Sequence, residues 1–412
     1  MARADSFRPQ EQGYKRVTNC QQLRLKKGEE RRLNMGHLWV FSNEVDVKAS
    51  PLADLEPGSE VAVTDYRGNI LGCATVNPQS LICARLHARS LVPLDEELIA
   101  KRLGNALALR ESLFDKPFYR LVHAEGDFLP GLVVDRFGSH FTVQVTTLAM
   151  EKRRDAVKSA LESIFAPTSI LWDNTVALRA LEGLELFRTE DGACPETLEV
   201  PENDCVFSVF MKEGQKTGWY YDQRPNRALM QHFAKGKRVL DAFCYAGGFG
   251  VNAGLAGARE VVFCDASKKA LAMAKDNLHR NAKGTSCTCL EGDAFETLKS
   301  LKDRGERFDI VSIDPPAFIK RRKDHKEGLT AYRRINALAL TLVADGGLFF
   351  TSSCSQLLCA DELKSCASHA AARHGLHLRL LHQGFQGPDH PVHCAMPETA
   401  YLKCLVYSCN KL

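Results

Sequence analysis

A cysteine between two serines, Ser353-Cys354-Ser355, directly follows the apolar run of residues 347–352, which is typical of a buried strand. A thiolate at that place could add to C6 of a pyrimidine and so make C5 of the ring nucleophilic. Most free cysteines are small buried apolar residues, and the chain contains 15 cysteines. Cys354 is the cysteine whose predicted position at a strand end fits covalent catalysis.

A second motif, Asp314-Pro315-Pro316-Ala317-Phe318, follows the apolar run of residues 308–313. Two prolines stiffen the loop. The neighbouring aromatic ring is suited to stacking on a nucleobase that has been flipped out of its base stack. The alternative is a rigid turn with a phenylalanine in the core. We predict that Asp314 acts in catalysis and that Phe318 contacts the substrate.

Three acidic residues, Asp241, Asp265 and Asp293, each end one of three successive predicted strands. The first is followed by a glycine-containing turn, which lets a ligand approach the backbone at the carboxyl end of the strand. The spacing Gly248-x-Gly250-x-x-Ala253 also fits an NAD site, but Asp241 would repel a pyrophosphate. Each acid alone could cap a helix. Together they favour S-adenosylmethionine, which carries an amine, ribose hydroxyls and adenine.

The segment from Thr217 to Arg227 combines a glycine turn, aromatic residues and a helix start, with Pro225 in the first turn. We expect it to cover the cofactor site. The predicted cofactor-binding residues are Asp222, Gln223, Arg224, Asp241, Phe243, Tyr245, Gly247, Gly248, Phe249, Asp265, Ala266, Asp293, Ala294, Asp314 and Pro316.

These motifs require a parallel sheet covered by helices on both faces, which is the α/β class with a Rossmann-like sheet. We predict strands at 238–243, 260–265, 308–313 and 347–352, and a weaker one at 286–291. Helices are predicted at 250–257, 267–280, 332–343 and 360–374. The last two strands, at 377–385 and 401–408, lack a helix between them and predict an antiparallel hairpin.

Ahead of this region the pattern changes twice. Residues 21–90 contain short alternating strands separated by turns, which predicts a small β barrel. Residues 91–205 mix helical and strand spacing and predict a central α/β domain. We therefore expect three domains, at 1–90, 91–205 and 206–412.

The bulk composition is that of a globular protein, with 45% hydrophobic and 25% charged residues in 412. No run approaches 18 apolar residues, and the N-terminus lacks an apolar signal segment, so we expect a cytoplasmic protein with reduced thiols and no membrane span. A metal site at His390, His393 and Cys394 is disfavoured, because no second ligand cluster accompanies them. The oligomeric state stays open, a homodimer included.

The net charge is only +4, but basic residues cluster in two segments. Residues 1–38 hold nine Lys and Arg against four Asp and Glu, and residues 320–334 hold seven against two. Such clusters either contact phosphates or form a solvated face. Among them we select Arg321, Arg322 and Lys323 as predicted substrate-binding residues.

Taken together, the motifs resemble those of ribosomal large-subunit RNA cytosine-C5 methyltransferases of the RlmI type. LKKGEERRLNMGHLWVFSNEV looks like the N-terminal PUA domain of that family, an RNA-binding barrel, and AEGDFLPGLVVDRFG is similar to its central domain. Its methyltransferase motifs are similar to KTGWYYDQRPNR, DAFCYAGGFGVNA, IDPPAF, SSCS and PETAYLK. The resemblance implies cytosine in 23S rRNA, or a large-subunit precursor, as the substrate and Cys354 as the nucleophile. Cys404 stands where glycine would be expected.

Two other functions remain open on the residues alone. An Asp-Pro-Pro motif followed by an aromatic also suits amino-methyltransferases acting on guanine N2 or adenine N6, which need no thiol. A non-catalytic RNA-binding or assembly factor could retain the same fold. The acids at 241, 265 and 293 beside Cys354 favour an enzyme.

Overall fold

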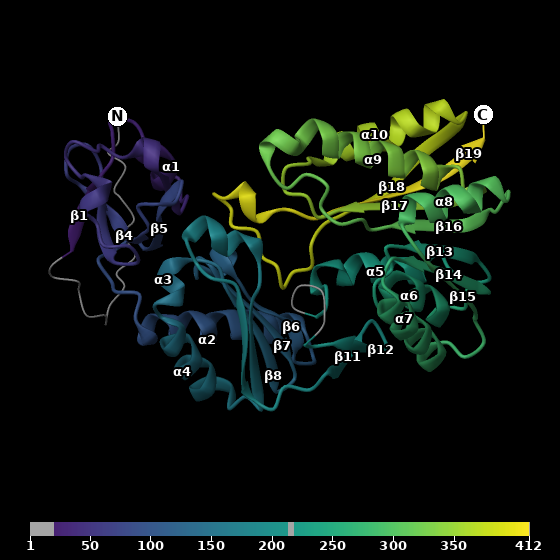
Figure 1. Cartoon of the computed structure of the whole chain (residues 1–412), viewed down its shortest axis with the longest axis horizontal. Coiled ribbons are helices and arrows are strands. Elements are labelled where there is room, and N and C mark those ends of the chain that lie inside the picture. Colours follow the sequence, from purple (N-terminus) through teal and green to yellow (C-terminus); the bar gives the residue numbers. More distant parts are fainter. Residues whose placement is uncertain (1–19, 213–217, 412) are drawn as a thin grey trace. The chain divides into compact units, whose positions relative to one another are not determined.

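The computed structural model describes residues 20–212 and 218–411, which form two compact units (Figure 1). The N-terminal unit contains residues 20–113, 120–193 and 392–397, and the C-terminal unit contains the other described residues. The short segment 392–397 therefore belongs to the N-terminal unit although its flanking residues belong to the other. The domain boundaries near residues 90 and 205 stay a prediction.

A small β barrel begins the N-terminal unit. Its sheet has the order β1-β3-β4-β5-β2, and a bridge between Leu25 and Val45 joins the chain beyond the two edge strands. Asp65 accepts hydrogen bonds from the amides of Arg67 and Asn69 in the tight turn of the β3–β4 hairpin, as turn chemistry predicts. Met396 is fully buried in the barrel core. The elements are β1 (Gln21–Arg24), α1 (Glu30–Asn34), β2 (Trp39–Phe41), β3 (Glu60–Thr64), β4 (Ile70–Val76) and β5 (Ile82–Ala88).

A second five-stranded sheet follows, with the order β10-β9-β8-β7-β6. Helices α2 and α4 pack against each other in this part. A hairpin of β11 (Thr197–Glu202) and β12 (Cys205–Phe210) then opens the C-terminal unit. The remaining elements are α2 (Glu96–Leu113), β6 (Phe118–His123), β7 (Leu132–Phe137), β8 (His140–Val145), α3 (Leu148–Glu151), α4 (Arg154–Phe165), β9 (Ser169–Asn174) and β10 (Phe187–Gly192).

The C-terminal unit is built on a seven-stranded sheet with the order β15-β14-β13-β16-β17-β19-β18. Neighbours are parallel except β19, which is antiparallel to both β17 and β18, so the predicted terminal hairpin is confirmed. The strands are β13 (Arg238–Ala242), β14 (Glu260–Asp265), β15 (Ser286–Glu291), β16 (Phe308–Ile313), β17 (Val343–Ser353), β18 (Leu376–Gly384) and β19 (Lys403–Lys411).

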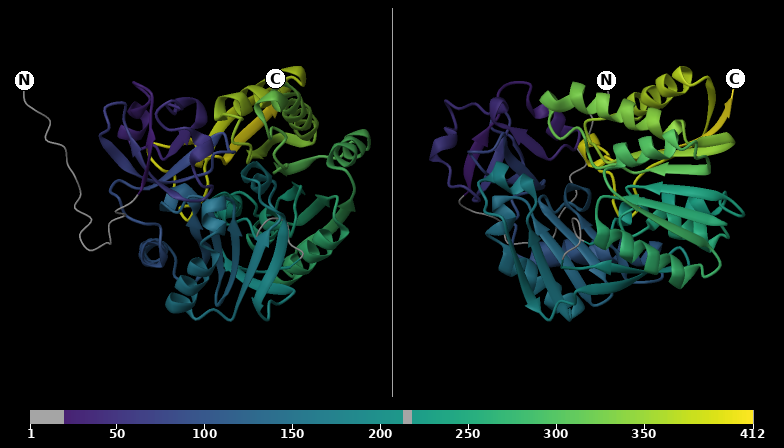
Figure 2. Two further views of the ribbon diagram at one scale, coloured as in Figure 1. Left: turned by 60° about the vertical axis from the view of Figure 1, so that its left-hand side comes forward. Right: turned by 45° about the vertical axis from the view of Figure 1, so that its right-hand side comes forward.

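Helices cover both faces of this sheet. Figures 1 and 2 show α6 and α7, with α5 beside them, on one face, and α8, α9 and α10 on the other. The strand order reverses between β13 and β16, which is the point where open α/β sheets bind ligands. The helices are α5 (Arg224–Gln231), α6 (Gly248–Leu255), α7 (Lys268–Asn281), α8 (Ala294–Asp303), α9 (His325–Leu340) and α10 (Ala360–Arg373).

Two helices differ from the sequence prediction. Helix α8 was not expected, although Asp293 caps it and Leu298 and Leu301 bury its inner face. Helix α9 begins at His325 instead of 332 and includes Gly328. A Cβ at Gly328 would lie 2.8 Å from the main-chain oxygen of Phe318, so close packing against that loop explains the glycine.

No helix in residues 20–212 and 218–411 is long and apolar enough to cross a membrane. The core of the C-terminal unit lies between the sheet and the helices α8 to α10, with Val311, Phe349 and Leu363 among its fully buried side chains. This core holds the carboxyl ends of the parallel strands in fixed positions, and the loops that carry the motifs start there.

Candidate active site at the carboxyl ends of the parallel strands

A cavity of about 550 Å³ lies where β13, β14, β16 and β17 end. It is lined by residues from the segment of Thr217 to Arg227, the glycine turn, the Asp-Pro-Pro motif and the Ser-Cys-Ser motif. The predicted site residues that line it are Asp222, Gln223, Phe243, Tyr245, Gly248, Phe249, Asp265, Ala266, Asp293, Ala294, Asp314, Pro316 and Cys354.

Each of the three strand-end acids also accepts main-chain hydrogen bonds. Asp265 accepts from the amides of Tyr245 and Ser267, both at 2.9 Å. Asp293 accepts from Phe295 and Glu296 at the start of α8, as a helix cap does. Capping and ligand binding are therefore compatible at these positions, because a carboxylate has more than two acceptor sites.

Asp241 differs from the other two acids because it does not line the cavity. Its side chain is almost fully buried and accepts a hydrogen bond of 2.8 Å from the amide of Gly250. Burial raises the pKa of this carboxyl to about 7, and the negative charges of Asp314 and Asp265 act in the same direction. Asp241 thus holds the glycine turn at the start of α6.

The turn after β13 has an unusual backbone. Phe243 and Tyr245 adopt φ angles of 60° and 48°, although residues with bulky side chains rarely enter this region. Gly248 is needed for space, because a Cβ there would lie 2.7 Å from Cδ of Arg227. Strained backbone of this kind is concentrated at ligand sites. Gly247 does not line the cavity, and its φ of 83° makes the turn possible.

The segment after residue 217 contributes two linked polar groups. The side-chain amide of Gln223 donates to Asp314 Oδ2 at 2.9 Å, and Asn226 in turn donates to Gln223 at 2.7 Å. Asp222 accepts from the hydroxyl of Tyr401 at 2.6 Å. These bonds connect the start of α5 to the Asp-Pro-Pro loop and to Tyr401, which lies just before β19.

Cys354 lies directly after β17, partly exposed to the cavity, between two buried serines. Tyr332 holds both serines, because its hydroxyl lies 2.8 Å from Ser353 Oγ and 2.8 Å from Ser355 Oγ. The amide of Ile319, in the loop after the two prolines, donates to Ser355 Oγ. A buried network therefore ties the cysteine turn to the Asp-Pro-Pro loop.

Lys403 is a site residue that sequence reasoning missed. It begins β19, and its ammonium donates to the main-chain oxygens of Ser355 at 2.5 Å and Tyr401 at 2.7 Å. Burial lowers the pKa of Lys403 to about 8, and a negative charge on Cys354 opposes that shift. Its position in the motif PETAYLK was a signal, but nothing in the sequence related it to Cys354 across the sheet.

Several predicted residues lie away from the cavity. Phe318 packs against Tyr332, with ring centroids 4.8 Å apart, and belongs to the edge of the core. Arg224 forms an ion pair with Glu202 at 3.5 Å and lies over the ring of Phe114. Phe318 thus has the core position that was its alternative role, and Arg224 is held by the ion pair and the ring contact.

The three basic residues of the following loop are solvent-exposed. They are Arg321, Arg322 and Lys323. Arg321 is paired with Asp324 at 2.8 Å, which reduces the charge that it offers to a ligand. Lys320, just before them, lines the cavity. The loop therefore leads from the cavity to a basic exposed surface.

No group of three or more His, Cys, Asp and Glu suited to a metal ion occurs in the described part of the chain. Asp389 and His390 are both buried, and the imidazole lies 3.0 Å from the carboxylate. His393 belongs to the N-terminal unit. The histidines of the final hairpin loop are thus divided between the two units.

The cavity residues fit S-adenosylmethionine. Asp265 and Asp293 keep acceptor capacity for ribose hydroxyls and an adenine amine, and several carboxylates in the wall suit a cationic sulfonium and ammonium. Of the two basic lining residues, Arg227 and Lys320, Arg227 is already bound to Glu202 at 2.6 and 2.7 Å, so it offers little to a pyrophosphate. The hydrogen-bonding and charged groups of the cavity therefore fit S-adenosylmethionine and do not fit NAD.

Comparison with known proteins gives two family matches and a set of relatives. Residues 23–89 match a PUA-like domain, and residues 185–405, more than half of the chain, match the S-adenosylmethionine-dependent methyltransferase family. The chain is 37% identical over 393 residues to ribosomal RNA large subunit methyltransferase I of Tolumonas auensis, covering 93% of this chain and 98% of that protein. It is 34% identical over 388 residues to the protein of the same name from Escherichia coli K12, covering 92% and 97%.

Solved structures share the fold at lower identity. The crystal structure of SMU.776, complexed with SAH, matches with a TM-score of 0.81 at 21% identity over 94% of this chain and all of that one. A SAM-dependent methyltransferase from Streptococcus mutans matches with a TM-score of 0.79 at 20% identity, over the same shares of the two chains. With two family models and full-length relatives in agreement, the chain belongs to the ribosomal RNA large subunit methyltransferase I family, which uses S-adenosylmethionine as its cofactor.

Proposed function

We propose that this protein methylates C5 of a cytosine in 23S rRNA, with Cys354 as the covalent nucleophile. The observation that carries the proposal is that Cys354, Asp314 and the strand-end acids Asp265 and Asp293 line one cavity. A thiol beside a predicted cofactor site is the arrangement that C5 methylation of a pyrimidine needs, and amino-group methylation does not need it.

The chemistry follows from Cys354. Its thiolate adds to C6 of the cytosine, a carbon–sulfur bond forms, and the electrons of the C5–C6 double bond become available at C5. S-adenosylmethionine, when bound, supplies the methyl group that C5 takes up. Removal of the C5 proton and cleavage of the carbon–sulfur bond then restore the aromatic base and the thiolate.

Lys403 supports the nucleophile in this scheme. Its ammonium is fixed on the carbonyl of Ser355, the residue after the cysteine, and a nearby positive charge favours the thiolate over the thiol. Because the pKa of Lys403 is about 8, the lysine is charged at neutral pH.

Asp314 and Gln223 are proposed to hold the base. The Gln223 amide donates to Asp314 Oδ2 and so orients this carboxylate, which we assign to the exocyclic amine of cytosine. Asp265 and Ala266 are assigned to the ribose of the cofactor, and Asp293 and Ala294 to its adenine. Phe243, Tyr245, Gly248 and Phe249 form the wall beside them.

The RNA part of the proposal rests on the family matches. The relatives at 34–37% identity are named ribosomal RNA large subunit methyltransferase I, and residues 23–89 match a PUA-like domain. We propose that the barrel and the exposed residues Arg321, Arg322 and Lys323 contact the RNA backbone. Positive side chains at exposed loops supply the salt-dependent part of such binding.

RNA in which 5-fluorocytidine replaces cytidine tests the mechanism. Fluorine at C5 is not eliminated as a proton is, so the wild-type enzyme should form a covalent protein–RNA complex that survives denaturation. Cys354→Ala should form none while it keeps its affinity for cofactor and RNA. Cys359→Ala, an exposed neighbour at the start of α10, should behave like wild type. Methylation by Cys354→Ala at a near-normal rate would contradict the C5 mechanism.

An amino-methyltransferase acting on guanine N2 or adenine N6 is the second candidate, and the Asp-Pro-Pro loop favours it. That reaction would use the aromatic residue of the motif to stack on the base. In this chain the ring of Phe318 packs on Tyr332. Mapping the methylated nucleoside in rRNA from cells with and without the gene separates the two reactions.

A further inference from the structure

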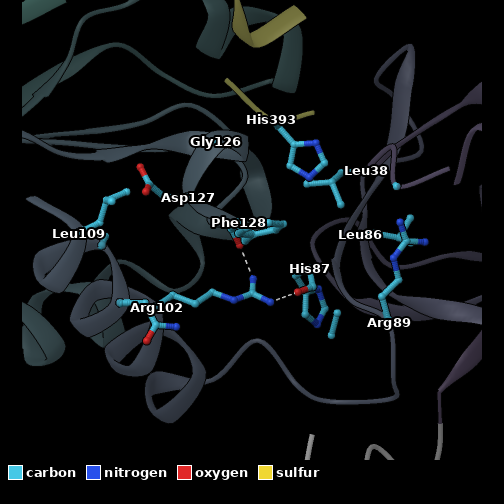
Figure 3. A pocket seen from close by; sticks show the side chains of 14 residues that line it. Leu38, Leu86, His87, Arg89, Arg102, Leu109, Gly126, Asp127, Phe128 and His393 are labelled. Atoms are coloured by element: carbon cyan, nitrogen blue, oxygen red, sulfur yellow. Dashed lines mark hydrogen bonds between the residues drawn. The ribbon is translucent and has the colours of Figure 1, made fainter. Parts of the chain in front are cut away.

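A second cavity of about 550 Å³ lies within the N-terminal unit, and the proposed reaction does not use it. Five segments form its wall: Gly36 and Leu38 of the barrel, the end of β5 at Leu86–Arg89, helix α2 at Arg102–Leu109, the loop ending in Phe128, and His393 of the 392–397 segment. Figure 3 shows Phe128 and His393 facing the space opposite Leu86 and Arg89, with His87 and Arg102 along its lower side. The cavity wall therefore contains residues of the barrel, of helix α2 and of the loop that ends in Phe128.

Phe128 presents an aromatic ring to this cavity from a strained backbone. Its side chain is 50% exposed, and it adopts the left-handed conformation at φ 59° and ψ 23°. A bulky residue in that conformation is an outlier, and such strain is characteristic of ligand sites. The guanidinium of Arg102 donates to the main-chain oxygens of both Phe128 and His87, which holds the strained residue in place (Figure 3).

The loop before Phe128 is fixed from the barrel side as well. Trp39 donates from Nε1 to Glu125 Oε1 at 2.8 Å. The ring of His393 meets that of Phe128 edge to face, with centroids 5.2 Å apart. Burial, together with the charges of His37 and Arg89, lowers the pKa of His393, so the imidazole is neutral. The cavity therefore contains two rigidly held, neutral aromatic surfaces.

The polar groups of the wall favour an anion. Arg89 is exposed at the cavity and has no hydrogen bond or ion pair within residues 20–212 and 218–411. Asp127, the acidic residue of the wall, is already neutralised by Arg110, at 2.5 and 2.7 Å. The charge available to a ligand is therefore positive.

His87 adds an unsatisfied acceptor to the wall. It is 3% exposed, and its Nε2–H donates to the carbonyl of Val92 at 2.8 Å. That bond leaves Nδ1 as an acceptor, for which the described residues offer no donor. Burial lowers the pKa of His87 to about 3, so the ring stays neutral and Nδ1 stays an acceptor. Unsatisfied buried acceptors are rare, so this polar atom beside the cavity is unusual.

We propose that this cavity binds one unstacked nucleotide of an RNA strand, with the base against Phe128 and His393 and a phosphate at Arg89. Aromatic stacking of splayed bases beside a cation is the way in which proteins hold single-stranded RNA. The volume falls within the roughly 300–1,000 Å³ of small-ligand pockets. The inference rests on the proposed RNA substrate but is independent of the chemistry at Cys354.

Fluorescence anisotropy with a labelled single-stranded RNA 12-mer of mixed sequence tests the site in the full chain without cofactor. Phe128→Asn should weaken binding roughly five- to 150-fold, because stacking is lost. Asparagine tolerates the left-handed conformation, so the variant should melt at or near the wild-type temperature. Phe128→Tyr keeps the ring and should bind like wild type. Arg89→Ala should weaken binding, whereas Arg379→Ala, which removes an exposed arginine of β18 in the C-terminal unit, should not.

The same RNA carrying 4-thiouridine provides a direct readout. Irradiation should cross-link it to the peptides that contain Phe128 or His393. If wild type binds the RNA while Phe128→Asn and Arg89→Ala bind equally well, or cross-links map elsewhere, the nucleotide site is wrong and the proposed function stands. If wild type binds no RNA at all, the proposed RNA substrate fails together with this site.

Discussion

The ammonium of Lys403 lies 2.5 Å from the main-chain oxygen of Ser355, the residue that follows Cys354. The two residues are brought together because β19 pairs with β17, which places Lys403 opposite Ser353 at the end of the sheet. The lysine carbon chain is largely buried there, so the positive charge is held close to the cysteine turn.

Replacement of this lysine should alter the pH profile of methylation. Lys403 loses its proton as pH rises through about 8, so the support for the thiolate should decline above that pH in the wild-type enzyme. Lys403→Arg keeps the charge and should move this decline to higher pH, whereas Lys403→Met should lower the rate at every pH. Lys411→Met, which removes an exposed lysine of the same strand, is the control. An unchanged profile in Lys403→Arg would contradict the assignment.

Removal of the Tyr332 hydroxyl should loosen the cysteine turn. Tyr332→Phe leaves the buried hydroxyls of Ser353 and Ser355 without that partner, which typically costs about 1–3 kcal/mol. We expect slower methylation with nearly unchanged affinity for S-adenosylmethionine, measured by calorimetry. Tyr407→Phe is a matched control, because the buried Tyr407 hydroxyl has no hydrogen-bond partner within the described residues. Equal loss of activity in both variants would argue against a specific role for Tyr332.

Substitution of Asp265 should weaken cofactor binding. Loss of a hydrogen bond to a charged group costs about 1.5–3 kcal/mol, roughly a ten- to hundredfold loss of affinity. Titration of Asp265→Ala with S-adenosylmethionine should show that loss, while RNA affinity stays near the wild-type value. Asp276→Ala, on the exposed face of α7, should bind the cofactor normally. The ribose assignment fails if Asp265→Ala binds as tightly as wild type.

The buried carboxyl of Asp241 should make stability depend on pH. Its folded pKa of about 7 lies above the unfolded value, so its contribution is complete below about pH 4 and is lost as pH rises to 7. Asp241→Asn can still accept from Gly250 but cannot ionise. The change in unfolding free energy between pH 5 and pH 8, from urea titrations, should therefore be smaller than in wild type, on the order of a few kcal/mol. A full wild-type dependence in Asp241→Asn would refute the buried carboxylate as its source.

The exposed basic loop should contribute to the salt dependence of RNA binding. Each neutralised phosphate contributes roughly −0.7 to −0.9 to the slope of log affinity against log salt. Triple replacement of Arg321, Arg322 and Lys323 by Ala should make the slope shallower by about one to three units. The control removes the same charge from the end of α8, at Lys299, Lys302 and Arg304. A slope that responds equally to both triples would mean that the loop is only a solvated surface.

The local sequence pattern was sufficient to predict much of the fold of the C-terminal unit. The alternation of apolar runs with helical spacing predicted the parallel strands of the C-terminal sheet. The pattern is strongest for the central strands β13, β14 and β16, which are largely buried and form apolar runs, and weakest for the exposed edge strand β15. The final hairpin followed from the absence of a helix between its strands. The carboxyl ends of parallel strands lie at one edge of a sheet, so the acids, the Asp-Pro-Pro loop and Cys354 were expected to lie close together. Asp265, Asp293, Asp314 and Cys354 do so, because they line one cavity.

Other features depend on contacts between residues far apart in the chain. Only the packing of Gly328 against the main chain of Phe318 shows why a glycine lies within α9. Phe318 itself was predicted to face the substrate, but Tyr332 and the core hold its ring. Lys403 reaches Ser355 only because β19 inserts next to β17, an antiparallel pairing that sequence spacing does not encode.

The residue types of this protein thus determined the elements, the edge of the sheet where ligands bind and the class of chemistry, because periodicity and strand-end position are local properties. Tertiary structure alone decided which side chains face the cavity and which face the core. It also decided that His393 lies beside Phe128, across more than half of the chain. These contacts depend on which partners the buried polar groups have and on how closely the backbone segments pack. No single stretch of sequence determines either of them.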